Sequence, residues 1–280
     1  MKIIFNKLSK YKAVPICITI ILIIGRVALA YIGKKKQLYL EYDYFYNVLN
    51  YLILLFAFLT FFKNKGVRWT YWSLLLVLFI INTMGLYKSV KNVEFQRSFT
   101  QGKNYFMVRE TKEEQGFSLV YEKRHKIFIY LVDKIIVKDG YKPFTRGDYK
   151  VIWPNDEKAI IKYTFGKDKK GKGDILNFTK LNGAYANLLG SLEGKWTDKS
   201  KSNTFEFSGG HITYKIGRSS YFYDSSMAGE QGNYGSILYG TKDTPTLYII
   251  KNPDNSLTVG SVDIKDNKVT IYNRVNSGKL

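Results

Sequence analysis

The apolar run from Thr70 to Tyr87, TYWSLLLVLFIINTMGLY, constrains this chain more than any other stretch. A helix of this length, at about 1.5 Å per residue, nearly crosses a hydrocarbon core about 30 Å thick. Two further apolar runs precede it, at about 14–33 and 45–62. The sequence therefore predicts three membrane-spanning helices within residues 1–88, with membrane lipid as their partner.

The basic residues around these runs predict their orientation. Four lysines precede the first run and three basic residues separate the second from the third, whereas five lie on the opposite side. The positive-inside rule then places the amino terminus in the cytoplasm and the residues after Tyr87 outside. Arg26, near the end of the first run, is expected to extend its guanidinium to the membrane surface. A cleaved signal peptide is the alternative for this run, because Ala28 and Ala30 form an A-x-A pattern.

The few polar residues in the apolar runs predict contacts between helices. Asn47, Asn50 and Asn82 lie in or beside the runs, and amides in lipid form hydrogen bonds across helix pairs. No aspartate or glutamate lies within the runs, so a proton relay or a transporter is not expected. Cys17 is the single cysteine, which excludes a disulfide framework and a thiolate metal cluster.

After Lys88 the sequence changes to short segments rich in Tyr, Phe, Ile and Val, separated by Gly, Asp, Asn and Lys. This pattern is typical of strands and turns. We expect a first β module at 89–180, a linker or short helix at 181–193 and a second β module at 194–280, each module with seven strands. The predicted fold class is therefore a helical membrane region with three spans plus an all-β soluble region of antiparallel sheets or a small barrel.

The second module contains the segments LEGKW, FEFSGGHITY and VTIYNRV, which resemble the small lipocalin-like β-barrel modules attached to many bacterial envelope proteins. In that family a G-x-W motif begins the first strand, and an arginine from the last strand packs over the tryptophan. The resemblance gives these structural roles to Gly194, Trp196 and Arg274. A guanidinium over an indole ring gains about 0.5–2 kcal/mol while it covers one barrel end.

A glycine-lysine motif and two histidines are residue types that serve catalysis or metal binding in other proteins, but in this sequence they are predicted to have structural or solvent-exposed roles. Gly166–Gly173, GKDKKGKG, nearly matches a phosphate-binding P-loop, but Gly173 replaces the required Ser or Thr and β composition follows it. It is predicted to be a solvated hairpin loop. His125 and His211 lack the neighbours of a zinc motif and are expected to be exposed. We therefore expect no catalytic residues, no metal site and no cofactor.

The loop Gly217–Gly235 is the most unusual soluble stretch, since it combines glycine and serine with Arg218, Tyr221, Tyr223 and Tyr234. Rigid aromatic side chains on an adaptable backbone are typical of recognition surfaces, so these four residues are candidate contacts to a ligand or partner. The alternative is that the tyrosines cap the core of a long hairpin.

Charge predicts the kind of partner. After Tyr87 the chain has 32 Lys and Arg but only 21 Asp and Glu, and the excess is dispersed. Such a surface attracts polyanions. We expect a non-enzymatic, membrane-anchored envelope protein that binds an anionic wall polymer or a protein, for example a toxin that it neutralises. The alternatives are an enzyme whose site forms only in the fold and a cytoplasm-facing nucleic-acid module, the latter disfavoured by the predicted orientation.

Overall fold

The computed structural model describes residues 13–60, 64–113, 116–123, 127–137, 140–165, 170–178, 188–230 and 234–275. The chain forms two compact units. The first contains the helices and the adjoining part of one sheet, and its ranges are Met1–Ser98, Phe106–Glu114 and Leu119–Lys134. The second contains most of the β structure, and its ranges are Phe99–Tyr105, Gln115–Ser118 and Ile135–Leu280.

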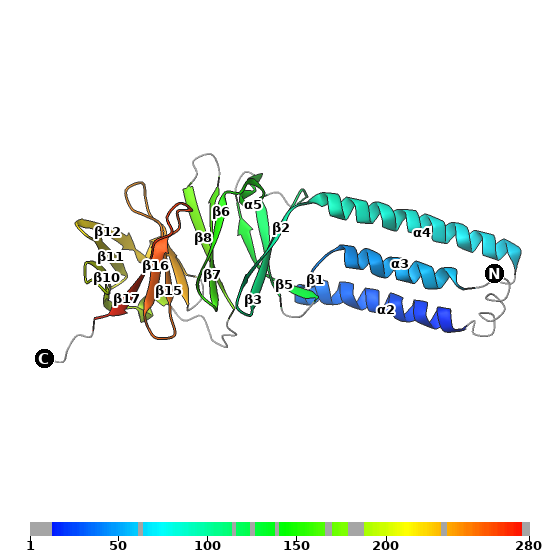
Figure 1. Cartoon of the computed structure of the whole chain (residues 1–280), viewed down its shortest axis with the longest axis horizontal. Coiled ribbons are helices and arrows are strands. Elements are labelled where there is room, and N and C mark those ends of the chain that lie inside the picture. Colours follow the sequence, from blue (N-terminus) through cyan, green and yellow to red (C-terminus); the bar gives the residue numbers. More distant parts are fainter. Residues whose placement is uncertain are drawn as a thin grey trace. The chain divides into compact units, whose positions relative to one another are not determined.

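The first unit contains the helices α2 (Ala13–Lys36), α3 (Tyr44–Phe58) and α4 (Lys65–Asn92), shown in Figure 1. With 24 and 28 residues, α2 and α4 are long and apolar enough to cross a membrane, and most of their large apolar side chains are exposed. The prediction of three full-length spans is wrong for 45–62, because α3 has 15 residues, about 22 Å of helix. It ends where the Ala57 carbonyl accepts hydrogen bonds from the Thr60 N–H (2.9 Å) and the Tyr71 hydroxyl (2.8 Å).

Helix α3 contacts both α2 and α4. The Asn50 amide donates to Asn82 Oδ1 at 2.9 Å, and the Asn82 amide donates to the Asn47 carbonyl at 3.2 Å. Next to them the hydroxyls of Tyr51 and Thr83 lie 2.9 Å apart. These bonds confirm the prediction for the amides of Asn50 and Asn82, whereas the Asn47 amide donates to the Asp43 carbonyl one turn away at 3.4 Å and does not join two helices.

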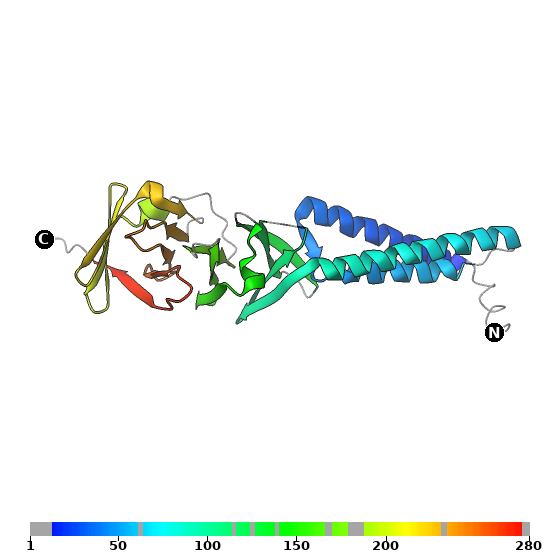
Figure 2. The same cartoon turned by 90° about the horizontal axis from the view of Figure 1, so that it is seen from above.

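Two of the helices lead into strands of one sheet. Its hydrogen-bonded order is β1-β5-β4-β3-β2. Helix α2 is followed by β1 after one residue, and α4 ends where β2 begins, as Figure 2 shows. In chain order the strands are β1 (Leu38–Leu40), β2 (Val93–Gln101), β3 (Asn104–Thr111), β4 (Phe117–Lys123) and β5 (Phe128–Ile136).

The short loop between α2 and α3 is fixed to this sheet. Its strand β1 pairs antiparallel with β5. The Glu41 carboxylate accepts a hydrogen bond from Lys123 of β4 at 2.9 Å, and the Asp43 carboxylate accepts one from Arg109 of β3. Since Glu41 and Arg109 are largely buried, these ion pairs are screened less than surface pairs. The helical hairpin therefore contributes a strand and two charge contacts to the sheet.

A second sheet has the order β6-β7-β8. Its strands are β6 (Tyr149–Asn155), β7 (Lys158–Phe165) and β8 (Lys170–Asn177), and the one-turn helix α5 (Pro143–Arg146) precedes them. The turn from β6 to β7 lies at 156–157, one residue beyond Asn155, and the pairing of the two strands is irregular between Ile152 and Asn155. Pro154 falls in this irregular stretch, where a residue without an N–H is tolerated.

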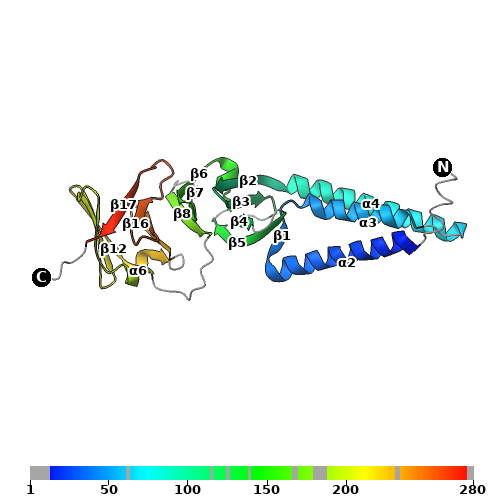
Figure 3. The ribbon, with the colours of Figure 1, turned by 60° about the horizontal axis from the view of Figure 1, so that its bottom comes forward.

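The third sheet is an up-and-down meander of nine strands, in the order β12-β11-β10-β9-β17-β16-β15-β14-β13. Because β17 pairs with β9, the sheet curls into a nearly closed barrel, in which β12 and β13 are the two edge strands. Figure 3 shows its strands β12, β16 and β17. The short helix α6 (Leu188–Ser191) precedes it. The strands are β9 (Gly194–Asp198), β10 (Asn203–Ser208), β11 (His211–Ile216), β12 (Ser219–Asp224), β13 (Ala228–Glu230), β14 (Gly235–Leu238), β15 (Leu247–Lys251), β16 (Leu257–Ser261) and β17 (Val269–Arg274).

Side chains fill the inside of the barrel. Trp196, Phe205 and Tyr272 are among its fully buried members, together with aliphatic residues from β14, β15 and β16. The other faces of β14 and β15 are buried too, because Ile237 and Tyr248 join a second core with residues of β7 and β8. The three-stranded sheet and the barrel-like sheet are therefore packed against each other by a shared core.

Candidate functional site

The first candidate group lies where the barrel closes. Arg274 pairs with Trp196 in the register of β17 and β9, and its guanidinium carbon lies 5.6 Å from the centre of the indole ring. Trp196 is buried and donates its Nε1–H to the Leu192 carbonyl at 2.8 Å, while Arg274 donates to the Glu193 carbonyl. Gly194 has a φ of 113°, and a Cβ there would lie 3.6 Å from the guanidinium nitrogens. The group holds the barrel together and offers no reactive atom.

The four candidate contact residues do not form one site. Arg218 is exposed in the turn between β11 and β12, and Tyr221 is partly buried on β12. Tyr223 is buried inside the barrel and donates to the Pro245 carbonyl at 2.6 Å. Tyr234 packs against the second core, and residues 231–233 lie outside the described residues. Of the four, Arg218 is exposed, Tyr221 and Tyr234 are partly buried against two different cores, and Tyr223 is inaccessible to a partner.

An exposed aromatic residue lies next to them. Phe222 of β12 is 68% exposed, and β12 has one hydrogen-bonded neighbour, β11, in the described part of the chain. A strand edge that carries neither proline nor lysine is open to pairing with another strand. Phe222 and the nearby exposed Arg218 belong to the unpaired side of this strand, which we call the β12 edge, whereas Tyr221 lies on the opposite face of β12, against the barrel interior.

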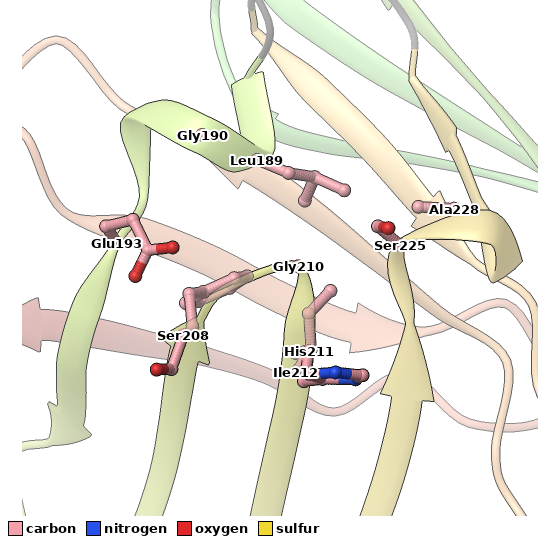
Figure 4. Close-up of a pocket in the computed structure, with 10 residues that line it drawn as sticks. Leu189, Gly190, Glu193, Ser208, Gly210, His211, Ile212, Ser225 and Ala228 are labelled. Atoms are coloured by element: carbon pink, nitrogen blue, oxygen red, sulfur yellow. The ribbon is translucent and has the colours of Figure 1, made fainter.

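A pocket of about 520 Å³ opens at one end of the barrel, near the gap between β12 and β13. Leu189, Phe207 and Ile212 give it an apolar part. Figure 4 shows Glu193 on one side and His211 and Ser225 on the other. The pocket is assembled from α6, the turn between β10 and β11 and the segment after β12.

Two polar groups of this pocket, Glu193 and His211, already contact other parts of the protein. Glu193 accepts a hydrogen bond from the Gly209 N–H at 2.9 Å. His211 is exposed, as predicted, and its Nδ1 lies 3.6 Å from Asp224, whose pKa is lowered chiefly by the hydrogen bond from the Ser226 N–H. Among the described residues no three His, Cys, Asp or Glu side chains gather as a metal site. The pocket therefore presents one carboxylate and one imidazole from different elements.

Two buried lysines on β7 were not found by sequence analysis. Lys162 is fully buried, and its ammonium donates to the Asp266 carbonyl at 2.7 Å and lies 5.4 Å from the centre of the Tyr248 ring. Burial lowers the pKa of Lys162 to about 8. Lys158 donates to the Lys251 carbonyl, and burial also lowers its pKa. Both lysines attach β7 to the barrel.

The described end of the glycine-lysine motif, at residues 170–173, contributes to packing. Gly171 and Gly173 lie in β8, and a Cβ at either one would come within 3.1 Å of Val262 atoms. Residues 166–169 lie outside the described residues, as does His125. The two glycines therefore let β8 approach the barrel closely.

No family model and no curated protein matches this chain. Fold and geometry alone therefore define the class of protein, which combines a helical hydrophobic region with antiparallel sheets, one of them nearly closed into a barrel.

Proposed function

We propose that this protein is a membrane-anchored, non-enzymatic binding protein whose β region lies outside the cytoplasm. The exposed apolar side chains of α2 and α4 carry this proposal, because lipid is the environment in which such long apolar surfaces are stable. Both helices lead into strands of one sheet, so their carboxyl ends lie on the same side of the membrane. The chain must return between them, and α3 with the residues after it is the segment available for that return.

Aromatic residues support this membrane placement. Tyr42, Tyr44 and Phe45 stack at the start of α3, and Phe58 stacks on Trp72 at its other end. Such clusters mark the two interfaces of a membrane protein. The Arg26 guanidinium lies over the ring of Tyr46, so α3 covers part of this charge within the helical region.

The placement is tested in intact cells. We expect the protein to sediment with membranes in the absence of detergent, and external protease to cleave the residues after α4. Recovery in the supernatant would refute the membrane anchor. Cleavage only after the cells are opened would refute the outward orientation and would revive a cytoplasmic, nucleic-acid-binding alternative.

Positions of the carboxylates support a non-enzymatic role. Asp254, Asp263 and Asp266 each accept a main-chain N–H two residues ahead, as turn residues do. The hydrogen bonds from Ser256 lower the pKa of Asp254. An enzyme that uses paired carboxylates would instead bring them together in a concave site, whereas the described pocket has Glu193 as its single carboxylate.

We infer further that the barrel-like sheet is related to the small lipocalin-like modules. Its up-and-down strand order supports this relation, as does the pairing of β17 with β9 that brings Arg274 over Trp196. Because the interior is filled by side chains, binding takes place on the outer surface. We assign the contact surface to the β12 edge, where a partner protein would add a strand.

The partner is tested with a photo-crosslinking residue at position 222 of the full-length chain in cells. The matched control is position 271, because Ile271 is also exposed (56%) but lies on β17, which is paired on both sides. Crosslinks to a protein at 222 and not at 271 are expected. If capture is equal at the two positions, the β12 edge is not the contact surface.

The dispersed positive charge supports an anionic wall polymer as the second partner class. Binding of the full-length protein to wall material would then weaken as salt rises from low to physiological strength. Salt-independent binding that is lost in the Phe222→Ser variant would favour a protein partner over a polymer.

A further inference from the structure

Two tyrosine-lysine pairs occupy equivalent places on the two long helices. On α2 the Lys35 ammonium donates to the Tyr31 hydroxyl at 3.3 Å and lies 5.6 Å from the centre of its ring. On α4 the Lys91 ammonium donates to the Tyr87 hydroxyl at 3.4 Å and lies 5.5 Å from the centre of its ring. Two helices far apart in the sequence therefore present the same arrangement.

The pairs also match in depth and exposure. Each lysine is the penultimate residue of its helix, since α2 ends at Lys36 and α4 at Asn92. The next strands, β1 and β2, belong to one sheet, so both pairs lie on the side of the membrane that faces this sheet. Tyr31 is 62% exposed and Tyr87 is 67% exposed, so no protein element in the described residues covers the rings.

Each pair presents two hydrogen-bond donors to the same point. The lysine gives one of its three N–H groups to the tyrosine oxygen and keeps two for another acceptor. Because the tyrosine oxygen accepts this bond, its own hydrogen is free to donate. An ammonium and a hydroxyl side by side suit the oxygens of a phosphate monoanion, and the ring fixes the position of the flexible lysine chain.

We propose that Tyr31–Lys35 and Tyr87–Lys91 each bind the phosphate of an anionic phospholipid headgroup, in the leaflet next to the sheet. This proposal rests on the membrane placement proposed above, which brings both pairs to headgroup level. Lipid phosphates are the anions present at that level in large excess, and their negative charge attracts the two lysines.

Neighbouring charges leave these pairs available to lipid. The carboxylates of Glu41 and Asp43, which follow α2, are occupied by Lys123 and Arg109. Glu113 lies 3.3 Å from Lys88. Glu41, Asp43 and Glu113 are therefore paired with cations other than Lys35 and Lys91.

The binding is tested with full-length protein extracted from membranes in detergent. Thermal stabilisation is measured on addition of phosphatidylglycerol, of phosphatidylcholine and of inorganic phosphate. We expect phosphatidylglycerol to stabilise the protein. The double variant Tyr31→Phe, Tyr87→Phe should need about fivefold more phosphatidylglycerol for the same rise in melting temperature, since each site loses one hydrogen bond to phosphate. The variant keeps both aromatic rings and both lysine charges. A difference from wild type therefore reports the hydrogen bond from the tyrosine hydroxyl and not the electrostatic attraction of lysine to an anionic lipid.

The matched control is Lys34→Gln, which removes an exposed charge one residue from Lys35 without touching a tyrosine-lysine pair. This control is expected to change the phosphatidylglycerol concentration needed for stabilisation by less than twofold. Equal requirements for wild type and the double phenylalanine variant would overturn the proposal, as would equal stabilisation by phosphatidylcholine. Competition by millimolar inorganic phosphate would show a soluble anion site in place of a lipid site. Recovery of the protein without membranes would instead overturn the membrane placement itself.

Discussion

Lys162 offers the sharpest test of how the three-stranded sheet is attached to the barrel. Its ammonium is fully buried, and main-chain carbonyls of the segment between β16 and β17 accept its hydrogen bonds. No carboxylate lies within ion-pair distance of it among the described residues. The perturbation is a rise in pH, compared between wild type and Lys162→Met.

The sign and size of the effect follow from the lowered pKa. The folded protein holds the Lys162 proton with a pKa of about 8, and the unfolded chain with the ordinary value of 10.5. Between these values the unfolded state binds more protons, so the free energy of unfolding rises with pH. The buried charge costs about 3 kcal/mol at neutral pH, and about 2 kcal/mol of this is recovered by pH 9.5.

The assay is urea unfolding of the full-length protein in detergent, followed by tryptophan fluorescence from pH 7 to 9.5. Subtracting the Lys162→Met curve removes the contributions of the tyrosines and other lysines. The difference in unfolding free energy is expected to change by about 2 kcal/mol over this range. Lys195→Met is the control, because Lys195 is exposed on β9. Parallel pH profiles for wild type and Lys162→Met would refute a charged, buried Lys162.

Three further substitutions test other contacts. Arg274→Ala should destabilise the protein by about 0.5–2 kcal/mol and shift tryptophan emission to longer wavelength, because Trp196 loses its cover; unchanged stability and emission would contradict this role. A Cβ at Gly240 would lie 2.0 Å from the Thr244 carbonyl oxygen, so Gly240→Ala should cost about 1–3 kcal/mol in thermal or urea unfolding. A wild-type midpoint would refute the close approach. Asn82→Leu removes two hydrogen bonds between α3 and α4 and should cost about 1 kcal/mol in unfolding by SDS; an unchanged SDS midpoint would show that these bonds add nothing.

Strands with alternating or continuous apolar residues were predictable from sequence. Each of the seven strands predicted within 194–280 has a counterpart in the barrel-like sheet, and β9 and β13 are additional. The strand β1 was missed because its three residues follow a lysine run and give no periodicity. The strand β2 was missed because no glycine or proline separates it from α4. The end of α3 at Phe58 depends on contacts with α4, which no local signal records.

Candidate sites were less predictable than strands. The barrel-closing residues Gly194, Trp196 and Arg274 could be picked out from the sequence, because their residue types and spacing form a motif. Tyr223 was assigned to a recognition loop because glycine and serine surround it, but it is a core residue of β12. The buried Lys162 has no sequence signal, since a lysine in a strand is usually solvated and only the tertiary fold covers this one.

The first sheet is completed by a strand that comes from between two hydrophobic helices. A soluble fragment that begins after α4, for example at residue 93, would leave this strand behind and uncover the edge of β5. Such a fragment would be inclined to aggregate, so biochemical work should begin from the intact protein in a bilayer or detergent. The hydrophobic segment is thus part of the folding unit of the first sheet.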